Sequence, residues 1–464
     1  MFDLKKFADN IAIISDKGEK ISYQALHDRT EQMVKSLDRG FAFCLCSNTV
    51  DSIVGYISFL NNKIPALLLD TEINTEALEN LLSIYTPRYI WKPKVKHPDI
   101  EGKEKHSSAE YHLIDTGEPY SLSSSLALCL TTSGSTGSPK LVRLSAENLV
   151  SNAESIIEYL DIRETDRPVT SLPMHYSFGM SVINSHLYTG ATLLLTDKSI
   201  MQKDFWEFVR NERATSFSGV PYTYEMLRRL RFFRMDLPYL TTLTQAGGKL
   251  NEKIVKEFAD FSLEAGKRFF VMYGQTEASP RMSYLTTEEA SLRPSSIGKA
   301  IPGGKFQIVD AEGNLVDKPF VDGELVFRGK NVCLGYAESR EDLEKEDENH
   351  GVLHTGDVAH FDEEGFYYIT GRLKRFVKIW GNRCSLDALE QIVKEKTPEA
   401  VCVGEDNKVT VVVSGKDEIS GIKEMLVERT GFHPSAFSVV RIDEIPKNTS
   451  GKVLYENLKK ILKG

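Results

Sequence analysis

The strongest constraint on how this chain can fold is the alternation of short apolar runs with segments of helical periodicity. Near the N-terminus the pattern predicts strand, helix, strand, helix and strand at 41–46, 51–60, 64–69, 75–84 and 89–91. It returns further along, with predicted strands at 191–195, 216–219, 240–244 and 269–272 and helices between them at 204–210, 222–230 and 251–264. Strands separated by helices in this way favour parallel sheets covered by helices. Such sheets place their ligand-binding loops at the carboxyl ends of the strands.

The pattern then changes twice, which indicates more than one domain in a chain of 464 residues. From residue 295 to residue 371 the strands become short and are separated by Gly and Pro turns, which favours a small antiparallel or barrel-like subdomain. After residue 371, strand and helix signals mix again. We therefore expect an α/β protein with a large domain of parallel-rich sheets covered by helices at 1–371, its β-rich subdomain at 295–371, and a small α+β domain at 372–464.

Composition excludes several other classes of protein. Hydrophobic residues make up 41% of the chain and charged residues 27%, a globular balance that excludes a disordered or collagen-like chain. The net charge of −9 disfavours a nucleic-acid partner. Since the sequence has no apolar run of ~18 residues, we expect no membrane-spanning helix.

Cysteine usage suggests a reducing compartment. None of the six cysteines belongs to a C-x-x-C pair, and they are interpreted as reduced, buried thiols of a cytoplasmic protein. The residues after Met1 lack the long apolar core of a signal peptide, which agrees with that location.

One loop has the composition of an anion-binding site. Residues 131–140 are Thr-Thr-Ser-Gly-Ser-Thr-Gly-Ser-Pro-Lys, between predicted strands at 126–130 and 141–144. Small residues let backbone N–H groups approach an anion, the hydroxyls add donors, and Lys140 adds positive charge. The loop is not a Walker sequence, because no Gly-Lys-Ser/Thr closes it. The alternative of a flexible linker is disfavoured, since a linker rarely joins two neighbouring strands.

Three further segments carry residues suited to nucleotide chemistry. Residues 273–277 (Tyr-Gly-Gln-Thr-Glu) offer a ring for stacking, a hydroxyl and a carboxylate for Mg²⁺. Asp357 can accept from two ribose hydroxyls, with Arg372 as a donor beside it. The turn at 446–452 ends on Lys452. Taken singly, the first segment is better interpreted as a polar turn, and a surface lysine is an alternative interpretation of Lys452.

Together and in this order, these segments resemble the adenylate-forming superfamily of acyl-CoA synthetases, luciferases and peptide-synthetase adenylation domains. The resemblance extends from Ile21 to Lys452, nearly the whole chain. It implies a two-step reaction that uses ATP and Mg²⁺. A carboxylate attacks the ATP α-phosphate to give acyl-AMP and pyrophosphate, and a thiol or an amine then takes the acyl group.

The resemblance also implies roles for individual residues. The ATP phosphates are expected on Thr132, Ser133, Gly134, Ser135, Thr136, Gly137 and Lys140. The adenine is expected between Tyr273 with Gly274 on one side and Gly247, Gly248 and Lys249 on the other. The catalytic residues are expected to be Thr276 at the phosphate, Glu277 on Mg²⁺, and Lys452 between the acid and the α-phosphate. Asp357 and Arg372 are expected to hold the ribose, and Lys374 falls at the family's hinge between the two domains.

The acid substrate is expected near 172–180, which resembles the family's pocket entrance. Tyr176 occupies the gate position there, and Ser218, Gly219 and Val220 are expected to line the pocket. Amino-acid-activating relatives usually have Phe-Asp where this chain has Phe178-Gly179. Without that carboxylate an α-ammonium group would be buried unpaired, which favours a small, plain aliphatic or aromatic carboxylic acid.

The acyl acceptor is predicted to be CoA, and the phosphopantetheine arm of an acyl carrier protein is the alternative. Trp380 departs from the residue commoner in the family near the hinge, so the path of the thiol is not defined, and an amine acceptor is also open. A third hypothesis, from another class, is a non-catalytic nucleotide-binding relative. The presence of Thr276, Glu277 and Lys452 argues against it.

Overall fold

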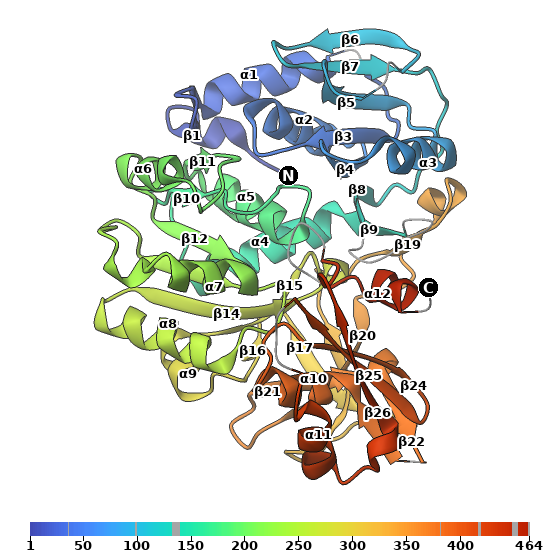
Figure 1. Cartoon of the computed structure of the whole chain (residues 1–464). Coiled ribbons are helices and arrows are strands. Elements are labelled where there is room, and N and C mark those ends of the chain that lie inside the picture. Colours follow the sequence, from blue (N-terminus) through green and yellow to red (C-terminus); the bar gives the residue numbers. More distant parts are fainter. Residues whose placement is uncertain are drawn as a thin grey trace. The chain divides into compact units, whose positions relative to one another are not determined.

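The computed structural model describes residues 1–35, 37–97, 100–131, 140–380, 382–415, 419–447 and 453–462 (Figure 1). They form two compact units, one of residues 1–305 with 328–353 and the other of residues 306–327 with 354–464. Each unit is described by itself. The domain boundary predicted after residue 371 stays a prediction.

The first unit contains an eight-stranded sheet whose centre is parallel. The strand order is β19 (Gly335–Ala337), β9 (Leu141–Ser145), β8 (Leu126–Thr131), β4 (Ala66–Asp70), β3 (Ala42–Cys46), β5 (Tyr89–Pro93), β7 (Tyr111–Asp115) and β6 (Lys103–Ser107). Strand β3 runs parallel to both β4 and β5, as the strand–helix alternation predicts. Every residue of β3 is buried, because helices cover a central parallel strand on both faces.

The same unit contains a nine-stranded sheet. Its order is β16 (Lys299–Ala300), β15 (Arg281–Leu285), β14 (Arg268–Gly274), β13 (Thr242–Gln245), β12 (Ser216–Gly219), β10 (Pro168–Val169), β11 (Leu193–Leu195), β1 (Ile11–Ser15) and β2 (Lys20–Ser22). Strands β12, β13 and β14 are parallel neighbours in register. The sequence pattern did not predict that β1 pairs with β11, which joins the beginning of the chain to its middle.

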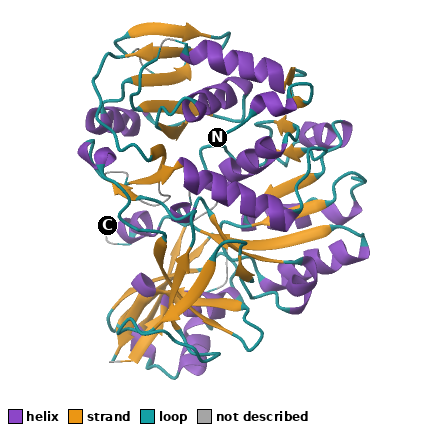
Figure 2. Ribbon diagram, turned by 180° about the vertical axis from the view of Figure 1, so that it is seen from behind, coloured by secondary structure: helices purple, strands orange, loops and turns teal. Residues whose placement is uncertain are grey.

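Helices lie beside the strands of both sheets (Figure 2). They are α1 (Tyr23–Val34), α2 (Val50–Asn61), α3 (Thr75–Tyr85), α4 (Ala146–Leu160), α5 (Ser177–Thr189), α6 (Lys203–Asn211), α7 (Pro221–Arg229), α8 (Glu252–Glu264) and α9 (Thr287–Leu292), with short 3-10 turns η1 (Leu4–Phe7), η2 (Phe232–Arg234), η3 (Thr276–Ala278) and η4 (Glu341–Glu344). Side-chain caps fix several starts: Thr49 accepts from Ser52 N before α2, and Asn74 accepts from Ala77 N before α3. One hydrophobic core takes residues from both sheets.

The second unit combines small sheets with short helices. Its four-stranded sheet has the order β17 (Lys305–Val309), β18 (Gly323–Arg328), β20 (Val352–Phe361) and β21 (Tyr367–Arg372), with the 3-10 turn η5 (Leu373–Arg375) after it. The rest is a two-stranded sheet of β22 (Phe376–Ile379) and β23 (Asn382–Ser385), a three-stranded sheet of β24 (Val401–Glu405), β25 (Lys408–Ser414) and β26 (Phe437–Ile442), and helices α10 (Leu386–Lys394), α11 (Ile422–Thr430), η6 (Pro434–Ala436) and α12 (Tyr455–Ile461). The predicted mixture of strands and helices after residue 371 is therefore confirmed.

All six cysteines lie within the described ranges and are buried and free, as their apolar surroundings in the sequence predict. No helix in the described part of the chain combines the length and apolar character needed to span a bilayer.

Candidate active site

The predicted site residues of the first unit converge on one edge of the nine-stranded sheet. Register pairs Ser218 with Thr244 and Gly219 with Gln245, so β12 and β13 end side by side, and β14 continues the parallel run. The sequence predicted ligand-binding residues at the end of each of these strands. They are 218–220 at the end of β12, 247–249 after β13, and 273–277 at the end of β14. Because parallel strands share one carboxyl edge, the fold gathers these three segments.

The first turn of α5 also reaches this edge. Tyr176 is the N-cap residue of α5 and is partly buried, and burial raises its pKa above the ordinary phenol value. Ser177 Oγ and Thr276 Oγ1 are hydrogen-bonded at 3.2 Å. The predicted gate residue and the predicted phosphate-contacting residue therefore belong to one cluster.

Gly247 shows how closely this cluster is packed. Its φ is +87°, and a Cβ at this position would lie 2.6 Å from the Tyr176 hydroxyl and 3.0 Å from Val220 Cγ1. A side chain here has to displace the Tyr176 ring, since the neighbouring atoms leave no room. The chain thus uses glycine to bring the end of β13 against the predicted gate.

We expect Gly247→Ala to raise the KM for the acid substrate at least about tenfold, because the new methyl group moves Tyr176. Gly266→Ala is the matched control: Gly266 has φ of +63° but nothing within 4 Å of its Cβ position, so it shares the backbone strain without the collision. Steady-state kinetics and thermal unfolding of both variants measure the difference. Equal KM values in the two variants would contradict this role of Gly247.

Gly179 is fixed by the backbone before α5. A Cβ on Gly179 would lie 2.2 Å from the carbonyl oxygen of Pro173, closer than any side chain allows. An aspartate is therefore incompatible with this backbone at position 179. This supports the sequence-based expectation that no carboxylate is present at this position for an α-ammonium group.

A chain of three side chains connects the end of the predicted phosphate loop to the predicted magnesium ligand. Lys140 Nζ lies 3.7 Å from the centre of the Tyr336 ring and 3.5 Å from Glu338 Oε1. The Tyr336 hydroxyl donates to Glu277 Oε1 at 2.9 Å. Burial, followed by the charge of Glu277, raises the pKa of Tyr336, so the phenol keeps its proton and stays a donor. Lys140 and Glu277 are thereby positioned by the same residue.

Sequence reasoning missed Tyr336, because its position depends on a long-range pairing. Strand β19 pairs antiparallel with β9, and this places Tyr336 opposite Val142. The backbone N–H of Cys333 also donates to the carbonyl of Glu277 at 2.8 Å. The only signal in the sequence was an aromatic residue in a segment otherwise assigned to a β-rich subdomain.

The donors at this edge fit a magnesium ion that arrives with a nucleotide. Among the described residues, no group of three or more His, Cys, Asp or Glu side chains is arranged as a metal site. Glu277 contributes one carboxylate, with the hydroxyls of Thr276 and Ser177 nearby. Mg²⁺ usually takes one or two protein carboxylates and completes its shell with phosphate oxygens and water. The residues present are thus suited to a metal shared with a phosphate group.

The predicted ribose-binding pair lies in the second unit. Strands β20 and β21 place Asp357 opposite Arg372, and Arg372 Nε donates to Asp357 Oδ1 at 3.0 Å. Asp357 is buried, whereas the Arg372 side chain is 51% exposed. Lys374, predicted at the hinge, lies in the turn η5, and its side chain is outside the described part of the structure.

Several predicted site residues lie outside the part of the chain that the structure describes. The phosphate-loop residues Thr132, Ser133, Gly134, Ser135, Thr136 and Gly137 and the catalytic Lys452 lie outside the described residues. Lys249 is described: its Nζ atom lies 3.7 Å from Glu252 Oε1, and both side chains are about half exposed.

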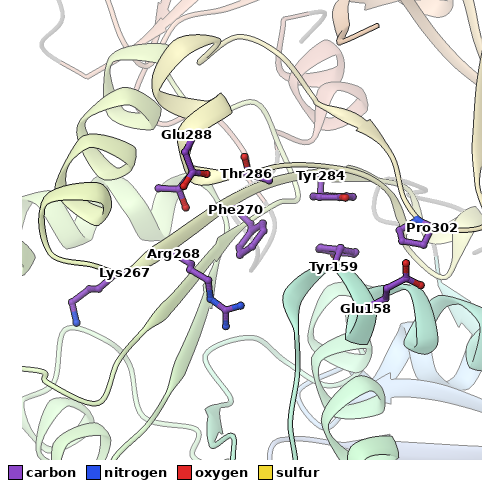
Figure 3. A pocket seen from close by; sticks show the side chains of 10 residues that line it. Glu158, Tyr159, Lys267, Arg268, Phe270, Tyr284, Thr286, Glu288 and Pro302 are labelled. Carbon is purple, nitrogen blue, oxygen red and sulfur yellow. The ribbon is translucent and has the colours of Figure 1, made fainter. Parts of the chain in front are cut away.

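Two pockets lie beside β14, and both reach Arg268, its first residue, at the end opposite the carboxyl edge. One is an open depression of about 420 Å³, in which the ring of Tyr159 stacks on Tyr284 with centroids 4.4 Å apart (Figure 3). The other is a smaller, partly open cavity of about 20 Å³ between α4, α5 and strands β12–β15. Ser218 lines this smaller cavity and accepts a hydrogen bond from Thr244 Oγ1 at 2.8 Å.

Parallel strands whose carboxyl-end loops gather hydroxyls and a carboxylate are typical of α/β proteins that bind phosphate-bearing ligands at a sheet edge. Comparison with known families specifies this class further. The family model described as "AMP-binding enzyme" matches residues 3–337, and the chain belongs to this family. The predicted resemblance to adenylate-forming enzymes is confirmed.

Relatives with known names agree. The chain is 25% identical to an oxalate–CoA ligase of Arabidopsis thaliana, over 97% of this chain and 95% of that protein. It is 27% identical to a 2-succinylbenzoate–CoA ligase of Bacillus cereus, over 96% and 94%. The match to a luciferin 4-monooxygenase of Nipponoluciola cruciata, 26% identical, covers 73% of this chain but only 64% of the luciferase.

Solved structures confirm the fold. The o-succinylbenzoate CoA synthetase of Bacillus subtilis, in complex with the acyl-adenylate intermediate OSB-AMP, superposes with a TM-score of 0.80 over 98% of this chain and 97% of that one, at 21% identity. ATP-bound MatB of Rhodopseudomonas palustris gives 0.78 over 99% and 98%, also at 21% identity.

Proposed function

We propose that this protein is an AMP-forming acid–CoA ligase. The Lys140–Tyr336–Glu277 arrangement, beside the hydroxyls of Thr276 and Ser177, is the observation that carries the proposal. It puts a positive charge and a carboxylate on either side of one phenol, next to two hydroxyl groups, and a triphosphate with its metal requires groups of these kinds. The relatives named as CoA ligases over almost the whole chain support the same reaction.

In the first step the acid carboxylate attacks the α-phosphorus of ATP, the bond to the β-phosphate breaks, and pyrophosphate leaves with its electron pair. Lys140 and the loop before it would hold the phosphates, and Thr276 would donate to them. Lys452 would lower the repulsion between the acid and the triphosphate. Mg²⁺ on Glu277 would neutralise charge on the departing pyrophosphate.

In the second step the CoA thiolate attacks the acyl carbonyl of acyl-AMP, and AMP leaves. Asp357 and Arg372 would keep the ribose bound during both steps, and a rotation about Lys374 would exchange the groups presented to the acid. The proposed location is the cytoplasm, which the six buried free thiols support.

Pyrophosphate release with ATP, Mg²⁺ and a panel of carboxylic acids tests the proposal. Each acid is assayed with CoA, with a phosphopantetheinylated carrier protein, and with neither acceptor. Acceleration by CoA alone is the expected result. Acceleration by the carrier alone would replace CoA as the acceptor while leaving the adenylation step in place. ATP binding without pyrophosphate release from any acid would favour the non-catalytic nucleotide-binding alternative.

A further inference from the structure

An arginine is buried beside the proposed acid site. Arg281 begins β15, four positions after Glu277, and only 3% of it is exposed. Its guanidinium lies 4.0 Å from the centre of the Phe178 ring on α5. The hydroxyl of Tyr159, on which Arg281 acts electrostatically, donates to Met272 Sδ at 3.0 Å.

This guanidinium has no anionic partner among the described residues. Burial lowers the pKa of the Arg281 guanidinium. The groups that act on it electrostatically are the phenols of Tyr159 and Tyr176. The Nε–H group finds no acceptor in the described part of the chain. Arginine stays protonated even when it is buried, and a buried charge without a partner is costly unless a ligand provides one.

Arg281 lines a small cavity of about 20 Å³ whose walls are mostly apolar. Ser181, Ser218 and Thr244 add hydroxyl groups to these walls, and Asp166 adds a carboxylate. The Ser181 hydroxyl donates to the carbonyl of Phe178 at 2.7 Å, so this hydroxyl is held against the backbone of α5.

Side-chain contacts connect Arg281 to the predicted acid site. The guanidinium of Arg281 lies over the Phe178 ring. This ring meets the Tyr176 ring edge-on, with the two ring centres 6.4 Å apart. Ser218, predicted to line the acid pocket, is also a wall of the cavity. A short acid with its reacting carboxylate near Tyr176 would therefore direct its other end toward Arg281.

We propose that the acid substrate carries a second anionic group, such as a second carboxylate, and that Arg281 binds it. The inference rests on the proposed ligase function and names its substrate class: short dicarboxylic acids. Arg281 then acts as the specificity-determining residue of the acid site.

The test compares dicarboxylates with monocarboxylates of equal chain length. Succinate is compared with butanoate and glutarate with pentanoate, in wild-type protein and in Arg281→Met and Arg281→Lys. We expect the wild type to favour one of the dicarboxylates at least roughly 10²-fold in kcat/KM over its monocarboxylate, because a site built for a polar group rejects the analogue without it. In Arg281→Met this ratio should fall to about one, and Arg281→Lys should restore part of it.

Two further measurements distinguish the possible outcomes. Arg281→Met should melt at the same temperature as the wild type or higher, since it removes an unpaired buried charge. A dicarboxylate should raise the Tm of the wild type without ATP and should not raise that of Arg281→Met.

If Arg281→Met unfolds at a clearly lower temperature and keeps the wild-type acid preference, Arg281 is structural and the inference is overturned. An equal preference for monocarboxylates in the wild type overturns it too, while the ligase function stands. If dicarboxylates stabilise the wild type through Arg281 but no acid releases pyrophosphate, the anion site stands and the proposed function fails.

Discussion

Lys452→Ala is expected to lower the rate of acyl-adenylate formation by at least about 10²–10³-fold, the loss typical of removing one preorganised charge stabiliser. An acid carboxylate and the ATP phosphates repel each other as they approach, and a lysine between them lowers that repulsion most in the transition state. Lys452 lies outside the described residues, so this prediction follows from the terminal sequence motif. Pyrophosphate release from ATP and acid measures the first step directly.

The second step separates a catalytic loss from a folding defect. When acyl-AMP is supplied, Lys452→Ala should form the thioester at close to the wild-type rate, because the adenylate is already made. Lys460→Ala, an exposed lysine on α12, is the matched control and should leave both steps unchanged. Equal loss in both steps of Lys452→Ala would contradict the assignment.

Glu277→Gln should have the other large effect. The amide keeps the shape of the side chain and an oxygen that can accept from Tyr336, but it loses the negative charge that would bind Mg²⁺. We expect adenylation to slow by about 10²–10³-fold and the Mg²⁺ concentration for half-maximal rate to rise at least about tenfold. A magnesium titration of pyrophosphate release measures both quantities.

Two further variants locate the cause of that effect. Tyr336→Phe keeps the carboxylate and removes only its hydrogen bond, so a smaller loss of roughly tenfold is expected, as for groups that orient a metal ligand. Glu264→Gln removes an exposed carboxylate at the end of α8 and should change neither rate nor magnesium dependence. A Glu277→Gln enzyme with unchanged magnesium dependence would show that Glu277 does not bind the metal.

Local patterns predicted much of the fold. The strand at 41–46 and the helix at 75–84 were found as β3 and α3 within one or two residues, because buried parallel strands and amphipathic helices leave their periodicity in neighbouring residues. The pairing of β1 with β11 was not predicted. It joins residues far apart in the chain, and the short apolar run of β1 does not specify its partner.

The candidate site, too, was predicted from the sequence only in part. The sequence by itself determined the residues of the motifs, such as Thr276, Glu277 and Lys140, because phosphate and metal binding require particular side chains at short spacings. Only the tertiary structure decided that Tyr336 joins Lys140 to Glu277, and that Arg281 is buried beside Phe178 without a carboxylate. These contacts depend on which strands pair and which helix covers them, and distant pairings of this kind leave no periodic signal in the sequence.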